Sequence, residues 1–325
     1  MERRLPLRLA GLVPVVLVLG TGFLLGPRVG FEERWSEPEV PDDPEAWLME
    51  REAGVPDLRL GDEKGVVWAD DLARTPTPVS LVYVHGFSAD RHEMEPVLSE
   101  VGRTAGANVF FTRLRGHGRN GAAMAEATVE DWLDDVAEAV AVGARIGSRV
   151  VLVGTSTGGT LATWAASRPE AASRVAGLVL VSPNFQPKDR TSRVLLLPWG
   201  SVVARTMIGE ERCFVPENDA QARHWTTCYP TEVLATMMAL VEHVRRMDLS
   251  SIDVPTLVLY SPEDQVVEPL ETERVLERMT GIEPEVRIVR STTDPARHVL
   301  AGDIVSPESN EEVRSVILAF LERIR

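Results

Sequence analysis

The chain has 325 residues, of which 44% are hydrophobic, so it is long enough for one large α/β domain and too apolar to be disordered throughout. Its formal net charge of −15 argues against binding of nucleic acid or of an anionic membrane surface by the folded part, because phosphate contacts need clustered lysine and arginine.

The N-terminus contains an almost uninterrupted apolar run over residues 9–26, preceded by arginines within residues 1–8. At about 1.5 Å per helical residue, this run can just cross a bilayer core of roughly 30 Å. Basic residues before it and acidic residues after it predict a transmembrane anchor with a cytoplasmic N-terminus and an extracytoplasmic domain. Two alternatives stay open: a cleaved secretory signal, which would make the protein secreted, and a buried core helix.

Residues 27–56 are rich in proline, glutamate and aspartate, which predicts a linker leading into a domain over residues 57–325. Trp35 and Trp47 lie in this stretch. We expect their side chains on the domain surface or at the membrane interface.

The first part of the domain alternates between two kinds of apolar pattern. Short apolar runs indicate buried strands, and apolar residues at helical spacing indicate a crossover helix. The expected order is strand 79–84, strand 108–112, helix 129–146, strand 150–153, helix 160–167 and strand 175–181. This order is typical of a mostly parallel sheet flanked by helices.

Residues 184–250 contain no comparable buried strand, but they carry aromatic residues and methionines at broadly helical spacings. An excursion of this length needs its own packing, so we expect a helical cap. Cys213 and Cys228 lie inside it, and an extracytoplasmic location would allow them to form a disulfide, with two buried thiols as the alternative. After the cap we expect strands 255–260 and 286–289 and a helix over 311–325.

The stretch 150–159 runs a buried strand into the sequence Gly-Thr-Ser-Thr-Gly at 154–158 and then into a helix. Glycines on both sides of Ser156 permit the cramped backbone that lifts a serine hydroxyl clear of a sheet. Ser156 is therefore the candidate nucleophile. The alternative is a glycine-rich crossover turn of another α/β fold, in which Ser156 only satisfies a helix N-terminus.

A serine hydroxyl is a weak nucleophile at neutral pH, so it needs a histidine base, and the imidazole needs a carboxylate to hold its tautomer. Among the six histidines, His298 lies just after the last expected strand. The acid is expected after strand 255–260, where Asp264 is the first candidate and Glu263 the second. The predicted catalytic set is thus Ser156, Asp264 and His298.

Further segments accompany this set: His-Gly-Phe at 85–87, Leu-Arg-Gly-His-Gly at 114–118, Asp131-Trp132 with Asp135, and Asp-Gln-Val-Val at 264–267. With them, the chain from about residue 60 onward resembles the α/β-hydrolase fold, and most closely its monoacylglycerol lipase and bacterial carboxylesterase branch. The resemblance implies a mostly parallel central sheet flanked by helices, with a helical cap inserted late in the sheet. It also implies an oxyanion hole made by the backbone N–H groups of Phe87 and Thr157.

The residue after the nucleophile departs from the pattern, because relatives with lipase activity often carry methionine where this chain has Thr157. The oxyanion donor is a backbone group, so the hole is unaffected, and the change concerns the shape of the adjacent pocket. His85 and His117 are expected to pack within their loops and not to act as bases.

The expected protein is thus a membrane-anchored serine hydrolase that cleaves carboxylic esters with a lipid-like acyl group through an acyl-enzyme, with no metal or organic cofactor. One alternative is an amidase, aminopeptidase or carbon–carbon bond hydrolase on the same scaffold. An aminopeptidase would need acidic groups in the cap, and the chain offers Glu210, Glu211, Glu217 and Glu232. The other alternative is a non-catalytic anchored binding protein. The sequence leaves oligomeric state, acyl length and leaving group open.

Overall fold

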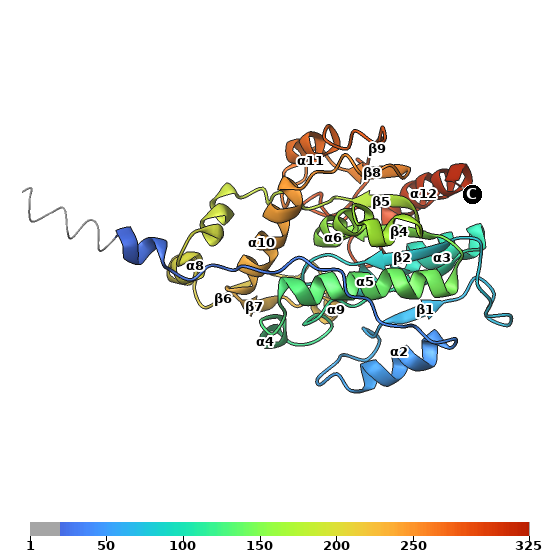
Figure 1. Ribbon diagram of the computed structural model, residues 1–325, viewed down its shortest axis with the longest axis horizontal. Helices are drawn as coiled ribbons and strands as arrows, with labels where there is room; N and C mark the ends of the chain where they lie inside the picture. Colours follow the sequence, from blue (N-terminus) through green and yellow to red (C-terminus); the bar gives the residue numbers. More distant parts are fainter. Residues whose placement is uncertain (1–19, 325) are drawn as a thin grey trace, which may run out of the picture.

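The computed structural model describes residues 20–324, which form a sheet of seven strands in the order β1-β3-β2-β4-β5-β8-β9 (Figure 1). The edge strand β1 pairs antiparallel with β3, and the other neighbours pair in parallel. The expectation of an α/β-hydrolase fold with a mostly parallel sheet is confirmed. The strands are β1 Gly65–Val67, β2 Ser80–Val84, β3 Asn108–Phe111, β4 Val150–Thr155, β5 Val175–Val181, β8 Thr256–Tyr260 and β9 Glu285–Ile288.

Helices cover both faces of the sheet, which explains why β2, β4 and β5 are buried along their whole length. On one face the core is shared with α5 Val129–Ile146, α6 Thr157–Ala166 and α10 Val233–Arg246. On the other face it is shared with α3 Glu95–Ala105 and α12 Asn310–Ile324. Shorter helices are α4 Gly121–Met124, α7 Pro169–Ala172 and α11 Pro269–Leu276, with 3-10 turns η1 Arg91–Glu93 and η3 Pro307–Ser309.

The segment between β5 and β8 is mainly helical, as a cap would be. Beside α10 it contains η2 Arg190–Leu196, α8 Gly200–Ile208 and α9 Asp219–His224. It also contains a hairpin that we did not expect, formed by β6 Glu211–Cys213 and β7 Cys228–Pro230. Cys213 faces Cys228 in this hairpin, and a disulfide joins them. The question that the sequence left open is thereby answered in favour of the disulfide.

Residues 27–56, which we expected to be a linker, instead pack on the domain. The Trp35 ring stacks on the buried Trp164 with ring centroids 5.5 Å apart. The stretch also contains helix α2 Pro44–Ala53, which starts where the Asp43 side chain accepts a hydrogen bond from the Ala46 N–H. At its end the buried Glu52 pairs with Arg113 of the domain. A proline-rich, acidic composition favours an extended chain, but these contacts hold the segment on the domain.

The expected membrane anchor at residues 9–26 lies mostly outside the described residues. Residues 20–24 are helical. Among residues 20–324 the structure has no helix that is both long and apolar enough to span a bilayer.

Candidate active site

The turn between β4 and α6 holds Ser156 at φ 52° and ψ −116°, a conformation that L-residues rarely adopt. The flanking glycines are required by contact. A Cβ atom at Gly154 would lie 2.3 Å from the carbonyl oxygen of Gly158, and a Cβ at Gly158 would lie 2.0 Å from that of Val84. A side chain at Gly158 would push the turn away from the end of β2, and one at Gly154 would push the end of β4 away from the start of α6, so the sequence pattern follows from the packing.

The imidazole of His298 and the carboxylate of Asp264 are directly paired, with Nδ1 and Oδ2 2.7 Å apart. Asp264 is 1% exposed, and its second oxygen accepts hydrogen bonds from the N–H groups of Val266 and Val267. These bonds fix the carboxylate just past the end of β8. The pairing places the proton on Nδ1 of His298 and leaves Nε2 free to accept one.

The backbone of His298 is held beside the strand ends that carry Ser156. The Asp294 carboxylate accepts a hydrogen bond from the His298 N–H at 2.8 Å, and the Ser182 hydroxyl donates to the His298 carbonyl at 2.8 Å. Ser182 directly follows Val181, whose carbonyl accepts the hydrogen bond from the Ser156 N–H at 2.9 Å. Serine turn and histidine loop are thus tied to the same end of β5.

No hydrogen bond joins the Ser156 hydroxyl to the His298 ring in the part of the chain that the structure describes. Hydrogen bonds between a nucleophile and its base are often long without substrate and shorten when substrate binds. Ser156 and His298 are 6% and 8% exposed, so both reactive groups are almost covered by protein.

The charge state of His298 is set by competing effects. Burial disfavours the imidazolium, but the charge of Asp264 and the hydrogen bond to it outweigh burial, and the pKa of His298 is raised above 6.5. The charge of Glu93 adds to this effect. The paired carboxylate thus stabilises the protonated form that a general base must pass through.

The loop after β2 lies against the serine turn, since a Cβ at Gly86 would be 3.4 Å from the Cβ of Ser156. Thr157 is the first residue of α6, where backbone N–H groups have no acceptor within the helix. The N–H of Phe87 likewise donates to no other group in residues 20–324. Both N–H groups that the resemblance assigns to the oxyanion hole are therefore available.

Glu93 is a buried carboxyl group at the site that the sequence did not indicate. It accepts hydrogen bonds from the Tyr83 hydroxyl at 2.6 Å and from the Gly86 N–H at 2.8 Å. Burial raises the pKa of Glu93. The bond to Gly86 fixes the loop that carries Phe87. In the sequence, the one indication of this role was the position of Glu93 shortly after strand 79–84.

His85 and His117 are both fully buried within their loops. The Leu114 N–H donates to Nε2 of His85 while Nδ1 of the same ring lies 2.9 Å from the Gly86 carbonyl, so the ring is neutral and clasped between two loops. Burial lowers the pKa of His85 to about 4 and that of His117 well below 6.5.

Glu263, the second candidate for the acid, is 64% exposed at its side chain and lies 3.8 Å from Arg290. Glu263 forms no hydrogen bond or ion pair with His298, whereas Asp264 forms both.

Apolar side chains of the cap pack against the loops that carry Phe87 and His298. Tyr229 of β7 packs edge-on against Phe87 with centroids 5.1 Å apart, within a cluster that also contains Met124 and Val233. A second cluster joins Trp225 of the cap to Val299, the residue after His298. The cap thus contacts both loops through apolar side chains.

Outside these residues, one group in the described chain has the composition of a metal site: Asp62, Asp90, His92 and His224. It includes none of Ser156, Asp264 and His298.

Comparison with known proteins agrees with this geometry. The family model described as "Serine aminopeptidase, S33" (Hydrolase_4) matches residues 76–293, which is more than half of the chain. The chain belongs to the Hydrolase_4 family. It is 28% identical over 218 residues to the thermostable monoacylglycerol lipase of Bacillus sp. (strain H-257), a match that spans 66% of this chain and 82% of that protein.

Solved structures are similar to this chain as well. A structure described under the metagenome-derived lipolytic enzymes LipS and LipT has a TM-score of 0.66 at 21% identity, covering 82% of this chain and 99% of that one. The monoacylglycerol lipase of Paleococcus ferrophilus has a TM-score of 0.59 at 17% identity, covering 81% and 98%. At sequence identities this low, structural similarity establishes a shared fold and no shared activity. The chain is accordingly a hydrolase of the α/β fold with distant lipase and esterase relatives.

Proposed function

We propose that this protein hydrolyses carboxylic esters with an apolar, lipid-like acyl group, such as monoacylglycerols, with Ser156 as nucleophile, His298 as base and Asp264 as the orienting acid. The observation that carries the proposal is the Asp264–His298 pair, 2.7 Å apart, held at the same strand ends as the strained Ser156 turn. If Ser156 belonged only to a strand-to-helix crossover turn, neither Asp264 nor His298 would be needed beside it.

In the proposed reaction, Nε2 of His298 takes the proton from the Ser156 hydroxyl as Oγ attacks the ester carbonyl. The N–H groups of Phe87 and Thr157 donate to the oxyanion, and each contributes about 10² to 10³ in kcat. The tetrahedral intermediate collapses as His298 returns the proton to the leaving alcohol, which leaves the acyl group on Ser156. Water then attacks the acyl-enzyme by the same steps and releases the acid.

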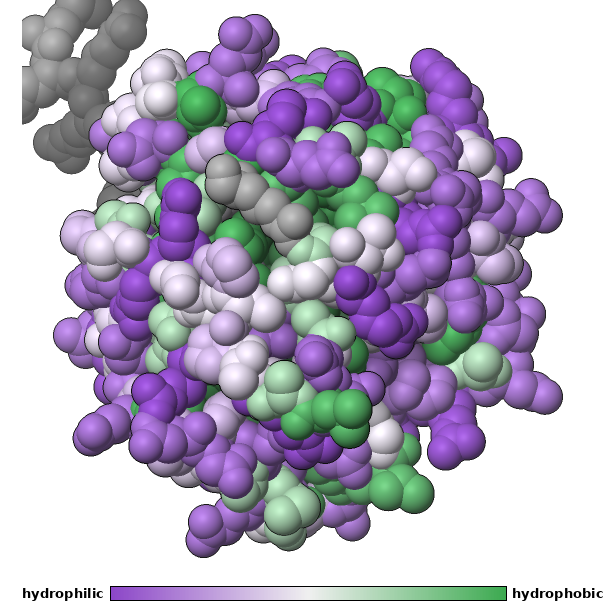
Figure 2. Space-filling view, turned by 90° about the vertical axis from the view of Figure 1, so that its right-hand side faces the viewer, coloured by the Kyte–Doolittle hydropathy of each residue, from purple (hydrophilic) through white to green (hydrophobic). Residues whose placement is uncertain are grey.

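The apolar acyl group is proposed from the apolar cluster of Tyr229, Met124 and Val233, which packs against Phe87. The outer surface of the cap gives a second reason. Helix α8 exposes Val202, Val203, Met207 and Ile208 to solvent. The opposite end of the molecule, where α12 lies, is mostly hydrophilic with scattered apolar side chains (Figure 2). The group of exposed apolar residues on α8 suits substrates that partition into a bilayer.

The N-terminal segment runs along this part of the cap. The Trp199 ring N–H donates to the Gly22 carbonyl at 3.2 Å, and the Trp199 backbone N–H donates to that of Pro27 at 2.9 Å. We propose that residues 9–26 anchor the protein in a membrane with the domain on the extracytoplasmic side, which would hold α8 beside the bilayer. Resistance to extraction by alkaline carbonate supports the anchor, and complete release into the soluble fraction contradicts it.

The aminopeptidase alternative is less well supported by the cap. It needs carboxylates that hold a substrate amine beside Ser156, but Glu210, Glu211, Glu217 and Glu232 are all exposed to solvent. None of them contributes to the apolar clusters around Phe87 and Val299.

The test is a panel that contains p-nitrophenyl esters of increasing acyl length, 1-monoacylglycerols and aminoacyl p-nitroanilides, assayed with wild type and Ser156→Ala. We expect hydrolysis of the esters with a preference for medium or long acyl chains, and no activity in the variant. Cleavage of anilides without cleavage of esters would assign the protein to the peptidases. Absence of all hydrolysis by the wild type would favour a binding protein.

A further inference from the structure

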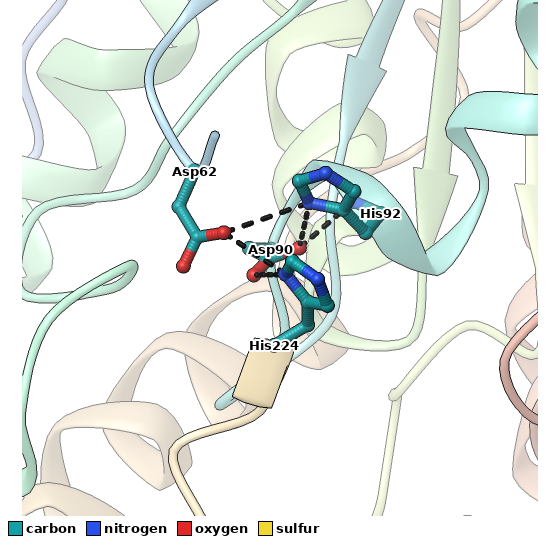
Figure 3. A group of neighbouring side chains, drawn as sticks. All are labelled: Asp62, Asp90, His92 and His224. Carbon is teal, nitrogen blue, oxygen red and sulfur yellow. Dashed lines mark hydrogen bonds and ion pairs between the residues drawn. The ribbon is translucent and has the colours of Figure 1, made fainter. Parts of the chain in front are cut away.

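Two aspartates and two histidines from three distant segments converge at the junction of the domain and the cap (Figure 3). Asp62 lies in the loop before β1, Asp90 and His92 lie after β2, and His224 ends α9 of the cap. One ligand atom from each residue lies within 4.8 Å of every other. We call these four residues the junction cluster.

The spacing of the ligand atoms fits a single tetrahedral ion. Nδ1 of His92 lies 3.0 Å from Asp90 Oδ1 and 3.5 Å from Asp62 Oδ1. Nδ1 of His224 lies 3.0 Å from Asp62 Oδ1 and 3.2 Å from Asp90 Oδ2. Ligands at zinc–nitrogen and zinc–oxygen distances of 2.0–2.1 Å lie about 3.4 Å from one another in a tetrahedron. The distances to Asp90 involve two oxygens, Oδ1 for His92 and Oδ2 for His224, so this carboxylate would bind the ion through one of them after a rotation or through both.

The orientation of the four side chains also favours a bound ion. The two imidazole rings stack with centroids 3.9 Å apart, and Figure 3 shows that both turn a nitrogen toward the carboxylates. The second oxygen of Asp62 accepts a hydrogen bond from Arg59 at 2.6 Å, which leaves Oδ1 directed at the histidines. Hydrogen bonds to the atom of a ligand that does not face the metal commonly orient the ligands of metal ions.

The charge balance gives an independent reason. The side chains of Asp62 and Asp90 are both 0% exposed, so two carboxylates are held together away from water. Among the described residues, Arg59 is the permanent cation in contact with them, 2.6 Å from Asp62 and 3.9 Å from Asp90. Buried charges are costly unless they are paired or coordinate a metal. With neutral imidazoles, Arg59 compensates one of the two carboxylates and one buried negative charge stays uncompensated, which a bound cation would offset.

We propose that the junction cluster binds one divalent transition-metal ion of the zinc class as a structural site. Imidazole and carboxylate ligands in a tetrahedral set suit Zn²⁺, and four protein ligands leave no position for substrate or water, as in structural zinc sites. The ion is not part of the hydrolytic reaction.

The site would hold the cap to the loop that carries Phe87. Asp90 and His92 follow this loop directly, and His224 belongs to the cap. The same junction contains a hydrogen bond from the Thr226 N–H to the Ser88 carbonyl at 2.7 Å. Metal binding therefore stabilises both the cap position and the loop after β2.

The rival interpretation is a metal-free network in which each imidazole donates a hydrogen bond from Nδ1 to a carboxylate. The distances of 3.0–3.2 Å are compatible with such bonds. The two interpretations differ in whether the wild-type chain takes up a stoichiometric ion, which can be measured directly.

The experiment uses the full chain without a polyhistidine tag, stripped with a chelator and titrated with ZnCl₂ by calorimetry. We expect one Zn²⁺ per chain, a higher Tm with zinc than with chelator, and tetrahedral-type visible absorption when Co²⁺ replaces Zn²⁺. Absence of stoichiometric binding by the folded wild type, or a Tm that does not respond to chelation, overturns the proposal.

Variants locate the ion. His224→Ala and Asp62→Asn should each weaken zinc binding at least about 100-fold and remove the Tm response. His243→Ala is the matched control, because His243 is a half-buried histidine 3.1 Å from a single carboxylate, that of Glu33, and should bind zinc as the wild type does. Ser156→Ala should also bind normally, which separates this site from the proposed hydrolysis. Equal binding by wild type and both cluster variants contradicts the assignment.

Discussion

Nδ1 of His298 lies 2.7 Å from Oδ2 of Asp264, while the other oxygen of Asp264 is occupied by the N–H groups of Val266 and Val267. The carboxylate therefore cannot rotate away, and the imidazole is held in the tautomer that leaves Nε2 free. This relationship determines how His298 is expected to act and how the site responds to substitution and to pH.

Replacement of Asp264 by Asn should lower kcat about 10⁴-fold, because the amide no longer selects the required tautomer of His298. Steady-state kinetics with a p-nitrophenyl ester measures the loss. Glu263→Gln is the matched control, since Glu263 is the adjacent carboxylate in the chain and is exposed. A large loss in Glu263→Gln with near-normal turnover in Asp264→Asn would move the acid to Glu263.

The pH dependence of kcat/KM should rise through an apparent pKa above 6.5, because only the neutral imidazole accepts the proton of Ser156 and the Asp264 carboxylate raises the pKa of His298. In Asp264→Asn the rise of kcat/KM should occur at lower pH, since the carboxylate that stabilises the imidazolium of His298 is gone. The stability effect has the opposite sense: the pairing stabilises the fold below pH 6.5 and this contribution is lost as pH rises through the raised pKa. An unchanged limb in Asp264→Asn would contradict the pairing.

Ser156→Gly and Ser156→Ala should both abolish activity but differ in stability. The positive φ of Ser156 costs an L-residue about 1–2 kcal/mol, and glycine avoids this cost. We therefore expect Ser156→Gly to be about 1 kcal/mol more stable to urea than Ser156→Ala. Equal free energies of unfolding would mean that the turn is not strained in solution.

Glu52→Ala should destabilise the protein by about 3–5 kcal/mol, because it leaves the buried guanidinium of Arg113 without its partner. Burial alone would raise the pKa of Glu52, but the hydrogen bonds and charge of Arg113 outweigh it and lower the pKa below 4.5. The stabilisation is therefore present above pH 4.5 and lost as pH falls through the lowered pKa.

Glu50→Ala on the same helix provides the control for this effect, since Glu50 is exposed. Both variants are compared by thermal and denaturant unfolding. A similar, small change in the two would show that α2 is not docked through Glu52.

The parallel core was predictable from the sequence because its signals are local. Helix α5 occupies residues 129–146 as predicted, since its apolar spacing is regular and Thr128 caps its start. The bounds of β5 also match. The chain order of Ser156, Asp264 and His298 could be read because each follows a recognisable strand.

Other features depend on contacts between distant segments. Helix α2 was hidden by the acidic, proline-rich composition around it, although Asp43 followed by Pro44 is a helix start signal. Glu93 is defined by its bonds to Tyr83 and Gly86. In the junction cluster, 162 residues separate Asp62 from His224, so no spacing motif could have revealed it.

The most direct test of the central claim is labelling by a fluorophosphonate probe, which reacts only with a serine that a neighbouring base activates. The account predicts covalent labelling of the wild type, none in Ser156→Ala, and strongly reduced labelling in a folded His298→Ala variant. Mass spectrometry should place the adduct on Ser156. Labelling of Ser156→Ala at the wild-type level, or full labelling without His298, would contradict the account.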